Sequence, residues 1–308
     1  NTTTLSAFVP SAGRRSGPVN EVIFSAICST YLCLASVMRY NSEMIVTRFA
    51  PSPTGHLHLG HAYSALLAWR EAKRAGGKFL LRIEDIDTGR CREEFVDSIL
   101  EDIHWLGLTP DGPVLRQSDR TTAYEEALTS LKGRGMLYPC FCTRKQIMAE
   151  IDAAGGAPHG LDGPVYPGTC KSLSEDEASQ RIRENEPHAL RLDIQRASEI
   201  AGNLNWTDHL AGTQSADYGI AGDVVLARKD IRNSYHLAVT LDDAAQDISL
   251  VVRGEDLFSA THIQRLLQAL LELPTPEYHH HPLLHDDSGK RLAKRSGAPT
   301  LRSLRSAG

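Results

Sequence analysis

Histidine and glycine gather in one short stretch of the chain, Arg48–His61, which reads RFAPSPTGHLHLGH. It follows a strand-like run and leads into a helix that we expect over 61–75. The first turn of a helix offers free backbone N–H groups and the positive end of the helix dipole, so it suits a phosphate. His58 and His61 can face the same phosphate, and Gly60 lets a ligand approach the backbone. The stretch therefore predicts a nucleotide-binding loop, with a Pro/Gly turn carrying surface histidines as the alternative.

Cysteines supply a second candidate site. Cys140 and Cys142 are separated by one residue, so they cannot conveniently bond each other, but they can point two thiolates at one metal ion. Cys170 follows after a loop rich in glycine and proline. Three cysteines and one further donor fit a tetrahedral structural zinc site, with Tyr166 and His159 as competing candidates for the fourth ligand. Unrelated reduced thiols are the alternative interpretation.

Two other polar clusters suggest metal binding less strongly. The three histidines 279–281 are consecutive. On a strand they point to alternating faces, so they cannot all reach one ion. The acidic run 84–87, EDID, looks like a magnesium cluster, but we expect a substrate ligand at Glu84 and capping or ion-pair acids at Asp85 and Asp87. Cys91 is expected to be a small buried residue on a helix over 91–106.

The elements that must position these residues follow an α/β pattern, in which apolar strands alternate with amphipathic helices. This alternation predicts a mainly parallel sheet covered on both faces. Ligands of such sheets bind at the carboxyl ends of the strands. A region over 140–230 interrupts the alternation and reads as an insertion. The expected strands are 44–50, 78–85, 223–230, 234–244 and 248–256, and the expected helices are 61–75, 91–106, 120–135 and 259–273.

Composition limits the classes of partner. The chain has 308 residues, 41% hydrophobic and 23% charged, with a formal net charge of −5, which argues against indiscriminate nucleic-acid binding. A local basic stretch, Lys290–Arg305, is the exception. Residues 1–43 differ from the rest and include a mostly apolar run. We expect a non-core N-terminal extension there, with a targeting segment as the alternative.

The motifs, taken in order, resemble the class I glutamyl-tRNA synthetases. HLGH resembles the ATP-binding HIGH motif, LRIEDIDTGR resembles the family's second block, and VVRGEDL resembles the block before its last core helix. KRLAKR resembles the KMSKS loop, with Ala293 where the family usually has Ser and with Lys294 retained. The resemblance covers residues 44–305.

This resemblance implies a fold: a Rossmann-like class I catalytic core with an inserted zinc-knuckle, acceptor-binding-like subdomain. It divides the chain into an extension (1–43), a first half of the catalytic domain (44–139), the inserted subdomain (140–222), and a second half with the KMSKS-like loop (223–308).

Three features are similar to one branch of the family, the glutamyl-queuosine tRNA(Asp) synthetases. The sequence ends just after the KMSKS-like loop, so no anticodon-binding domain is visible. The Cys-x-Cys…Tyr-x-x-x-Cys pattern looks like the zinc site of that branch, which favours Tyr166 over His159. The segment YHLAVTLDDA resembles the corresponding segment in the sequences of that branch. The resemblance implies that ATP and glutamate form glutamyl-adenylate, and that glutamate then passes to queuosine at the wobble position of tRNA(Asp).

The same resemblance assigns roles to individual residues. It implies one structural Zn²⁺, Mg²⁺ arriving with ATP, no membrane partner, a cytoplasmic protein and a monomer. The catalytic residues would be His58, His61 and Lys294; ATP would bind at His58, Gly60, His61 and Lys294; glutamate would bind at Arg48, Phe49, Ala50, Pro51, Ser52, Glu84, Tyr235 and Arg253; zinc would bind at Cys140, Cys142, Tyr166 and Cys170.

Three alternative functions stay open from the sequence. The chain could be a truncated or fragmentary glutamyl-tRNA synthetase that charges tRNA(Glu) at its 3′ end. It could be a non-catalytic tRNA-binding relative, which the retained His58 and Lys294 disfavour. It could be a nucleotidyltransferase that makes a small cofactor, which would not need a zinc knuckle.

Overall fold

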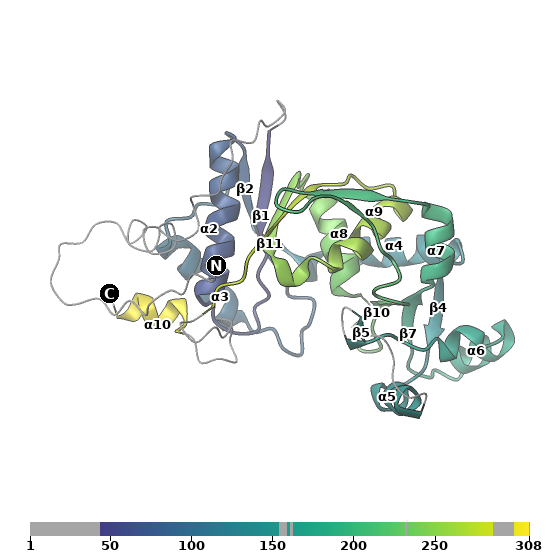
Figure 1. Ribbon diagram of the computed structural model, residues 1–308. Coiled ribbons are helices and arrows are strands. Elements are labelled where there is room, and N and C mark those ends of the chain that lie inside the picture. The colour runs from purple at the N-terminus through teal and green to yellow at the C-terminus, as the bar shows by residue number, and fades with distance from the viewer. Residues whose placement is uncertain (1–43, 154–158, 161–162, 232, 286–298, 308) are drawn as a thin grey trace, which may run out of the picture. The chain divides into compact units, whose positions relative to one another are not determined.

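The computed structural model describes residues 44–153, 159–160, 163–231, 233–285 and 299–307 (Figure 1). The predictions for residues 1–43 and for Lys294 in the KMSKS-like loop lie outside the described residues. The chain divides into two compact units. The first contains the described parts of Asn1–Arg116, Ile248–Asp256 and His279–Gly308; the second contains those of Gln117–Asp247 and Leu257–Tyr278.

The first unit is built on the parallel sheet that the sequence predicts. Its order is β1-β2-β3, and both pairs are parallel. Strand β11 lies beside β1, where the Ser249 backbone N–H donates to the Val46 carbonyl at 3.0 Å. The elements are β1 (Val46–Phe49), α2 (Leu59–Arg74), β2 (Lys78–Ile83), α3 (Glu93–Trp105), β3 (Leu115–Arg116), β11 (Leu250–Gly254) and α10 (Leu301–Ser306).

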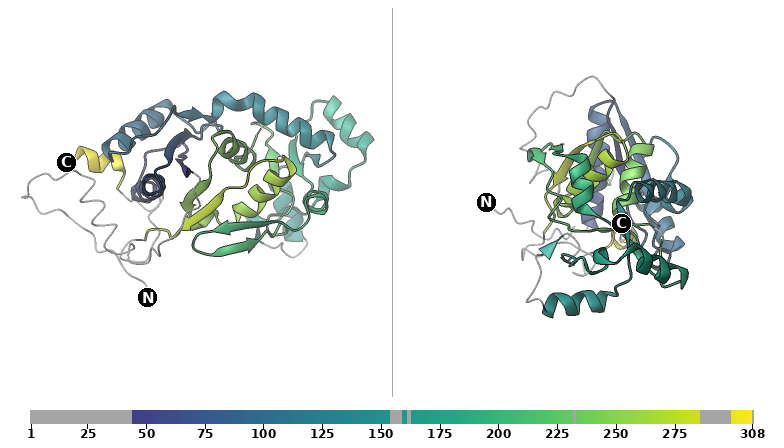
Figure 2. Two further views of the ribbon diagram at one scale, coloured as in Figure 1. Left: turned by 90° about the horizontal axis from the view of Figure 1, so that it is seen from above. Right: turned by 90° about the vertical axis from the view of Figure 1, so that its right-hand side faces the viewer.

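Helix α2 covers this sheet because one of its faces is apolar. Ala62, Leu66 and Ala65 on that face are buried in one core with residues of β1 and β2. The Thr47 hydroxyl of β1 donates to the Ala68 carbonyl of α2 at 2.8 Å, which fixes the helix against the strand. Helix α10, drawn in yellow, packs against α3 (Figure 2).

The described strands of the second unit belong to three small sheets, one of which is the β5-β6 pair, with helices around them. Strands β10-β7-β4 form one antiparallel sheet. Strands β8 and β9 form an antiparallel hairpin, and Tyr278 of β12 pairs in parallel with Asp208 of β8. The mainly parallel sheet predicted for the whole chain is therefore found in the first unit alone among the described residues. The strands are β4 (Leu137–Cys140), β5 (His159–Gly160), β6 (Gly163–Pro164), β7 (Ala189–Leu192), β8 (Asn205–Asp208), β9 (Gly212–Ser215), β10 (Val225–Ala227) and β12 (Glu277–His281), and residues 279–281 of β12 are counted with the first unit.

The helices of the second unit include one that the sequence pattern misassigned. They are η2 (Gln117–Arg120), α4 (Thr121–Gly133), α5 (Arg144–Ala153), η3 (Thr169–Ser172), α6 (Glu175–Arg183), α7 (Ile194–Ala201), α8 (Tyr235–Ala245) and α9 (Ala260–Leu270), and a short turn, η4 (Glu255–Leu257), follows β11. The prediction of a strand over 234–244 is wrong, because this segment is α8. Ser234 caps the helix by accepting from the Leu237 N–H, and the buried Asp242 accepts hydrogen bonds from Gln117 and Tyr124.

A second correction concerns Cys91. Helix α3 begins at Glu93, so Cys91 precedes the helix and is partly exposed rather than buried. Its backbone N–H donates to the Asp87 carbonyl at 2.9 Å, in the turn that leads into the helix. None of the helices in the described ranges combines the length and the apolar character that a membrane span requires.

Candidate active site and cysteine cluster

The N-terminal end of α2 is organised by its own histidines. His58 is the N-cap, and its Nδ1 accepts from the Gly60 N–H at 3.1 Å. The Nδ1 of His61 accepts from the His58 N–H at 3.2 Å, which completes a capping box. Histidine thus takes the part that Ser and Glu usually play in such a box. The two rings lie with their centroids 3.8 Å apart.

This capping determines which nitrogen of each ring can donate. A neutral imidazole whose Nδ1 accepts a hydrogen bond carries its proton on Nε2. The neutral forms of His58 and His61 are therefore both Nε2–H donors at the positive end of a helix dipole. The mouth of α2, by which we mean His58 to His61, can supply donors to the oxygens of a phosphate.

The candidate glutamate residues of the first unit lie at the carboxyl ends of neighbouring strands. Arg48 is near the end of β1 and Arg253 near the end of β11; both are buried, with 4% and 5% exposed. Arg48 Nη1 donates to the Val252 carbonyl at 3.4 Å, which ties β1 to β11. Glu84 follows β2, and its N–H donates to the Pro51 carbonyl at 3.0 Å. Arg48, Arg253 and Glu84 therefore lie at or just after the carboxyl ends of three strands of the first unit, and their role in binding glutamate stays a prediction.

The other candidate residues take two kinds of position. Phe49, Ala50, Pro51 and Ser52 continue directly from Arg48 along the end of β1. Tyr235 belongs to the second unit, in the first turn of α8, where its ring lies 5.6 Å from that of His236.

Sequence reasoning missed a role for the histidines of β12. The Arg253 Nε–H donates to His280 Nε2 at 3.0 Å, and His280 is buried. His281 Nε2 lies 2.8 Å from the Ser64 hydroxyl of α2. The run of three histidines drew attention in the sequence, but no pattern in it could reveal that these rings hold an arginine and a helix.

The cysteine cluster lies in the second unit and consists of Cys140, Cys142, Tyr166 and Cys170. The three Sγ atoms lie within 4.8 Å of one another. Cys142 Sγ is 3.3 Å from Cys170 Sγ and 3.6 Å from the Tyr166 hydroxyl oxygen. Strand β4 supplies Cys140 and the turn η3 supplies Cys170. All three cysteines are free thiols.

These distances fit the dimensions of a tetrahedral zinc site. Zn–S bonds near 2.3 Å and a Zn–O bond near 2.0 Å at tetrahedral angles place sulfurs about 3.8 Å apart and sulfur and oxygen about 3.5 Å apart. The side chain of His159, the competing fourth ligand, lies outside the described residues. The donor set of the cluster therefore fits zinc, and Tyr166 is already beside the sulfurs.

The local environment treats the thiols differently. Burial raises the pKa of Cys142 to about 11. Burial also acts to raise the pKa of Cys170, but hydrogen bonds from the Tyr166 hydroxyl and the Phe141 N–H outweigh it and lower the pKa. Because metal ligation requires thiolates, metal binding at this cluster would release protons.

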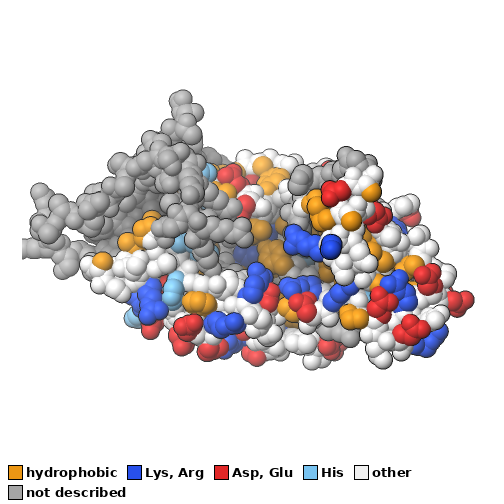
Figure 3. Space-filling model, turned by 90° about the horizontal axis from the view of Figure 1, so that it is seen from below, with side chains coloured by type: hydrophobic (Ala, Val, Ile, Leu, Met, Phe, Trp, Pro, Cys, Tyr) orange, Lys and Arg blue, Asp and Glu red, His pale blue; other side chains and the backbone are white. Residues whose placement is uncertain are grey.

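Charged side chains elsewhere are mixed in sign. On the face drawn in Figure 3, Lys and Arg side chains alternate with Asp and Glu. On this face, charges of both signs are interspersed, and no single sign covers it.

Comparison with known proteins decides the family. Residues 44–304 match the family model described as tRNA synthetases class I (E and Q), catalytic domain. The chain belongs to this family. The match runs through every motif on which the sequence resemblance was based, so the resemblance is confirmed, and with it the class I synthetase catalytic fold.

Curated relatives and solved structures of the family agree with this assignment. The Rhodobacter capsulatus protein named Glutamyl-Q tRNA(Asp) synthetase is 49% identical over 272 residues, which cover 86% of this chain and 96% of that protein. The Symbiobacterium thermophilum protein of the same name is 45% identical over 276 residues, with 86% and 82% covered.

The crystal structure of a glutamate tRNA ligase from Elizabethkingia meningosepticum has a TM-score of 0.71 and 31% identity, and the match covers 84% of this chain and 54% of that one. The glutamate-tRNA synthetase from Elizabethkingia anophelis has a TM-score of 0.72 and 32% identity, with 83% and 53% covered. This class I synthetase chain therefore spans about half the length of these two solved structures.

Proposed function

We propose that this chain activates glutamate with ATP and transfers the glutamyl group to queuosine at the wobble position of tRNA(Asp). The observation that carries the proposal is the level of identity. Relatives named Glutamyl-Q tRNA(Asp) synthetase are 42–49% identical over most of the chain, whereas the two solved glutamate–tRNA ligases are 31% and 32% identical.

In the first step, a carboxylate oxygen of glutamate attacks the α-phosphorus of ATP, and pyrophosphate leaves. The protein contributes by placing the reactants in line and by neutralising the charge that grows on the phosphate oxygens. The Nε2–H groups of His58 and His61 supply donors at the helix end, beside the backbone N–H of Gly60. Lys294 adds a positive charge. Mg²⁺ bound to ATP neutralises further phosphate charge.

Glutamate is held by charge complementarity. It carries two carboxylates and an ammonium group, so its pocket needs cations and one anion. The buried guanidinium groups of Arg48 and Arg253 can grip carboxylates through paired N–H donors. Glu84 faces the ammonium group. Ser52 and Tyr235 add hydrogen bonds, and Phe49, Ala50 and Pro51 shape the wall beside them.

In the second step, a hydroxyl of the cyclopentene-diol of queuosine attacks the carbonyl carbon of glutamyl-adenylate. The bond between this carbonyl carbon and the phosphate oxygen breaks, AMP leaves, the hydroxyl proton passes to solvent, and a glutamyl ester forms. The vicinal hydroxyls of queuosine resemble those of a ribose, so the ester chemistry is the same as that of tRNA charging. The stretch Lys290–Arg305 would contact backbone phosphates, which makes binding sensitive to salt.

The cysteine cluster would hold one structural Zn²⁺ through Cys140, Cys142, Tyr166 and Cys170. All four tetrahedral positions are taken by protein atoms, so no step of the reaction passes through the metal. We place the protein in the cytoplasm, where its substrates occur, and we expect a monomer. We also propose that the boundaries between the extension, the two halves of the catalytic domain and the inserted subdomain lie at 43/44, 139/140 and 222/223.

Transfer of radiolabelled glutamate tests the acceptor. We expect label on tRNA(Asp) that carries queuosine and none on the same tRNA with guanosine at the wobble position. Nuclease mapping should place the label in the anticodon loop. The Arg48→Ala variant should require much more glutamate for the same transfer, since it loses a carboxylate-binding group.

The second candidate function is the charging of tRNA(Glu), which the structural similarity to the two glutamate–tRNA ligases supports. The same assay separates the two candidates. Label on the 3′-terminal adenosine of tRNA(Glu), with none on tRNA(Asp), would replace the first proposal by the second.

A further inference from the structure

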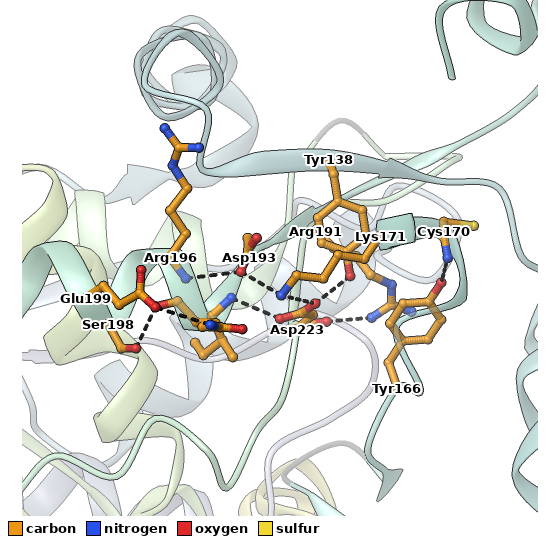
Figure 4. Close-up of polar contacts among 12 residues, drawn as sticks. Tyr138, Tyr166, Cys170, Lys171, Arg191, Asp193, Arg196, Ser198, Glu199 and Asp223 are labelled. Carbon is orange, nitrogen blue, oxygen red and sulfur yellow. Dashed lines mark hydrogen bonds and ion pairs between the residues drawn. The ribbon is translucent and has the colours of Figure 1, made fainter. Parts of the chain in front are cut away.

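We propose that Arg191 is the positioning residue that holds the Tyr166 phenol in place as the oxygen ligand of the cysteine cluster, and that Asp223 holds Arg191. This inference rests on the zinc site proposed above and concerns the residues around it. It assigns a function to a network of polar contacts that the reaction itself does not use (Figure 4).

Arg191 covers one face of the Tyr166 ring. Its guanidinium carbon lies 3.8 Å from the ring centroid, well within the range of a cation–π contact. One arm of the guanidinium, Nη1, donates to the Asp223 backbone carbonyl at 2.7 Å. The buried Nε has no hydrogen-bond partner among the described residues. The guanidinium group is therefore held by one hydrogen bond to Asp223 and by its stack on the Tyr166 ring.

Asp223 is itself fixed from three directions. Its Oδ2 accepts from the Tyr138 hydroxyl of β4 at 2.6 Å, and its Oδ1 accepts from the Ile194 N–H at the start of α7 at 2.9 Å. Lys171 Nζ, one residue beyond Cys170, lies 3.5 Å from Oδ2. Arg191 is therefore attached to a rigid frame formed by β4, α7 and η3, not to a loose loop.

Tyr166 depends on such a frame because its own segment is irregular. It follows the two-residue strand β6 and lies in no helix or strand. Its hydroxyl oxygen accepts from the Cys170 N–H at 2.8 Å and lies 3.6 Å from Cys142 Sγ. The Cys170 amide thus fixes the hydroxyl, and Arg191 fixes the ring. Together they keep the oxygen beside Cys142 Sγ; Figure 4 shows the Tyr166 hydroxyl at the Cys170 amide.

Charge favours the same assignment. Three thiolates and a phenolate bring more negative charge than one divalent ion neutralises. Arg191 places a positive charge against the phenol ring. Lys229 Nζ donates to the Phe141 carbonyl at 2.6 Å, between two of the ligand cysteines. Two cations, Arg191 and Lys229, therefore lie beside the cluster, and of these only Arg191 contacts a ligand side chain, so it is the one expected to tune affinity for the metal by positioning.

A second arginine provides a matched control. The guanidinium carbon of Arg181 lies 4.1 Å from the Phe141 ring centroid, so it makes the same kind of contact in the same cluster. Phe141 donates no ligand atom through its side chain, and Arg181 pairs with Glu186 at 2.7 Å. If stacking acts by positioning a ligand, Arg191 should matter for metal binding and Arg181 should not.

The experiment measures zinc affinity of the full chain by competition with a chromogenic chelator. We expect Arg191→Met to weaken zinc binding by about 10- to 100-fold, the usual effect of removing a residue that orients a ligand. Arg181→Met should change the affinity by less than about 3-fold on the same scale. In a Tyr166→Phe background, where no oxygen remains to be positioned, Arg191→Met should have little further effect. The Co²⁺-loaded protein should show altered visible absorption bands for Arg191→Met and unaltered ones for Arg181→Met.

Equal weakening by Arg191→Met in both backgrounds would show a purely structural role and overturn the proposal. Unchanged zinc affinity in Tyr166→Phe alone would also overturn it, since Tyr166 would then be no ligand. Failure of the unaltered chain to bind zinc would instead refute the metal site itself. If Arg191→Met does not fold, Arg191→Lys takes its place. It keeps the positive charge but loses the planar stack, and the same coupling to Tyr166→Phe is expected.

Discussion

The mouth of α2 and the cysteine cluster are assembled in different ways. At the mouth, four consecutive residues hold one another through backbone contacts, with His58 and His61 capping their own helix. In the cluster, the donor atoms come from residues up to 30 positions apart and meet across a loop (Cys140 to Cys170). The first geometry follows from local chain conformation. The second depends on neighbouring elements and, in our proposal, on a metal ion.

Because of this difference, we expect the largest effect of any single substitution at the cysteine cluster. Cys170→Ser should reduce bound zinc from one per chain to near zero and lower the melting temperature, because metal binding free energy is folding free energy at such sites. Glutamate-dependent ATP–pyrophosphate exchange should fall far less than zinc content. Metal analysis and calorimetry measure the effect.

Cys91→Ser is the matched control, since Cys91 is a free thiol outside the cluster. It should leave the zinc content unchanged. Full zinc content in Cys170→Ser would contradict the ligand assignment.

A substitution at the mouth of α2 that keeps the helix cap should lower activity without destabilising the protein. His58→Asn keeps a side-chain oxygen that can cap the helix but removes the Nε2–H donor, so exchange should fall by about 10²- to 10³-fold, the effect of losing one preorganised donor. Thermal unfolding should be nearly unchanged. His58→Ala loses both functions and should in addition lose about 1 kcal/mol of stability. Wild-type exchange in His58→Asn would show that His58 serves the helix alone.

Much of the first unit could be predicted from the sequence because its signals are local. The HLGH stretch predicted a helix and the place where it begins, and the predicted strands placed Arg48 at the end of β1 and Glu84 just after β2. Helix α8 could not be predicted in the same way. Its apolar run reads as a strand, and the deciding features are the Ser234 cap and the hydrogen bonds that Asp242 accepts from distant residues.

Contacts between residues far apart in the chain could not be predicted from the sequence either. Nothing in the run of three histidines indicates that His280 accepts from Arg253, or that Arg191 stacks on Tyr166. Both contacts join elements separated along the chain, and no periodicity or motif encodes them. The roles assigned to the site residues stay predictions.

A substitution in the proposed glutamate pocket should have a smaller effect than the loss of a donor to phosphate at His58. Arg48→Lys keeps the positive charge but loses the guanidinium fork, so we expect the KM for glutamate to rise by about 10- to 100-fold, with a smaller change in kcat. Steady-state exchange kinetics at varied glutamate and saturating ATP measure this. Arg90→Lys, at an exposed arginine paired with Asp87, is the control. An equal rise in the KM for ATP would argue against a glutamate-specific role.

The smallest expected effect concerns stability alone and arises from a buried carboxylate in α3. Asp102 is fully buried, and neither of its carboxylate oxygens accepts a hydrogen bond within the described part of the chain. Burial raises its pKa to about 6, although Arg305 of α10, 3.6 Å away, acts in the opposite direction. The folded state therefore holds this proton more tightly than the unfolded state, whose carboxyl has a pKa near 3.8.

The stability that Asp102 contributes is thus present at low pH, falls as the pH rises from about 4 to about 6, and is lost above that range. Asp102→Asn, which carries no charge to bury, should raise the free energy of unfolding by about 1–2 kcal/mol at pH values above about 7, and this gain should vanish near pH 4. Denaturant unfolding at several pH values measures the effect. Glu101→Gln, at the exposed acid that pairs with the same arginine, should show no such gain. A gain for Asp102→Asn that is independent of pH would mean that the charge of Asp102 is not its cause, and that the amide simply packs better beneath α10.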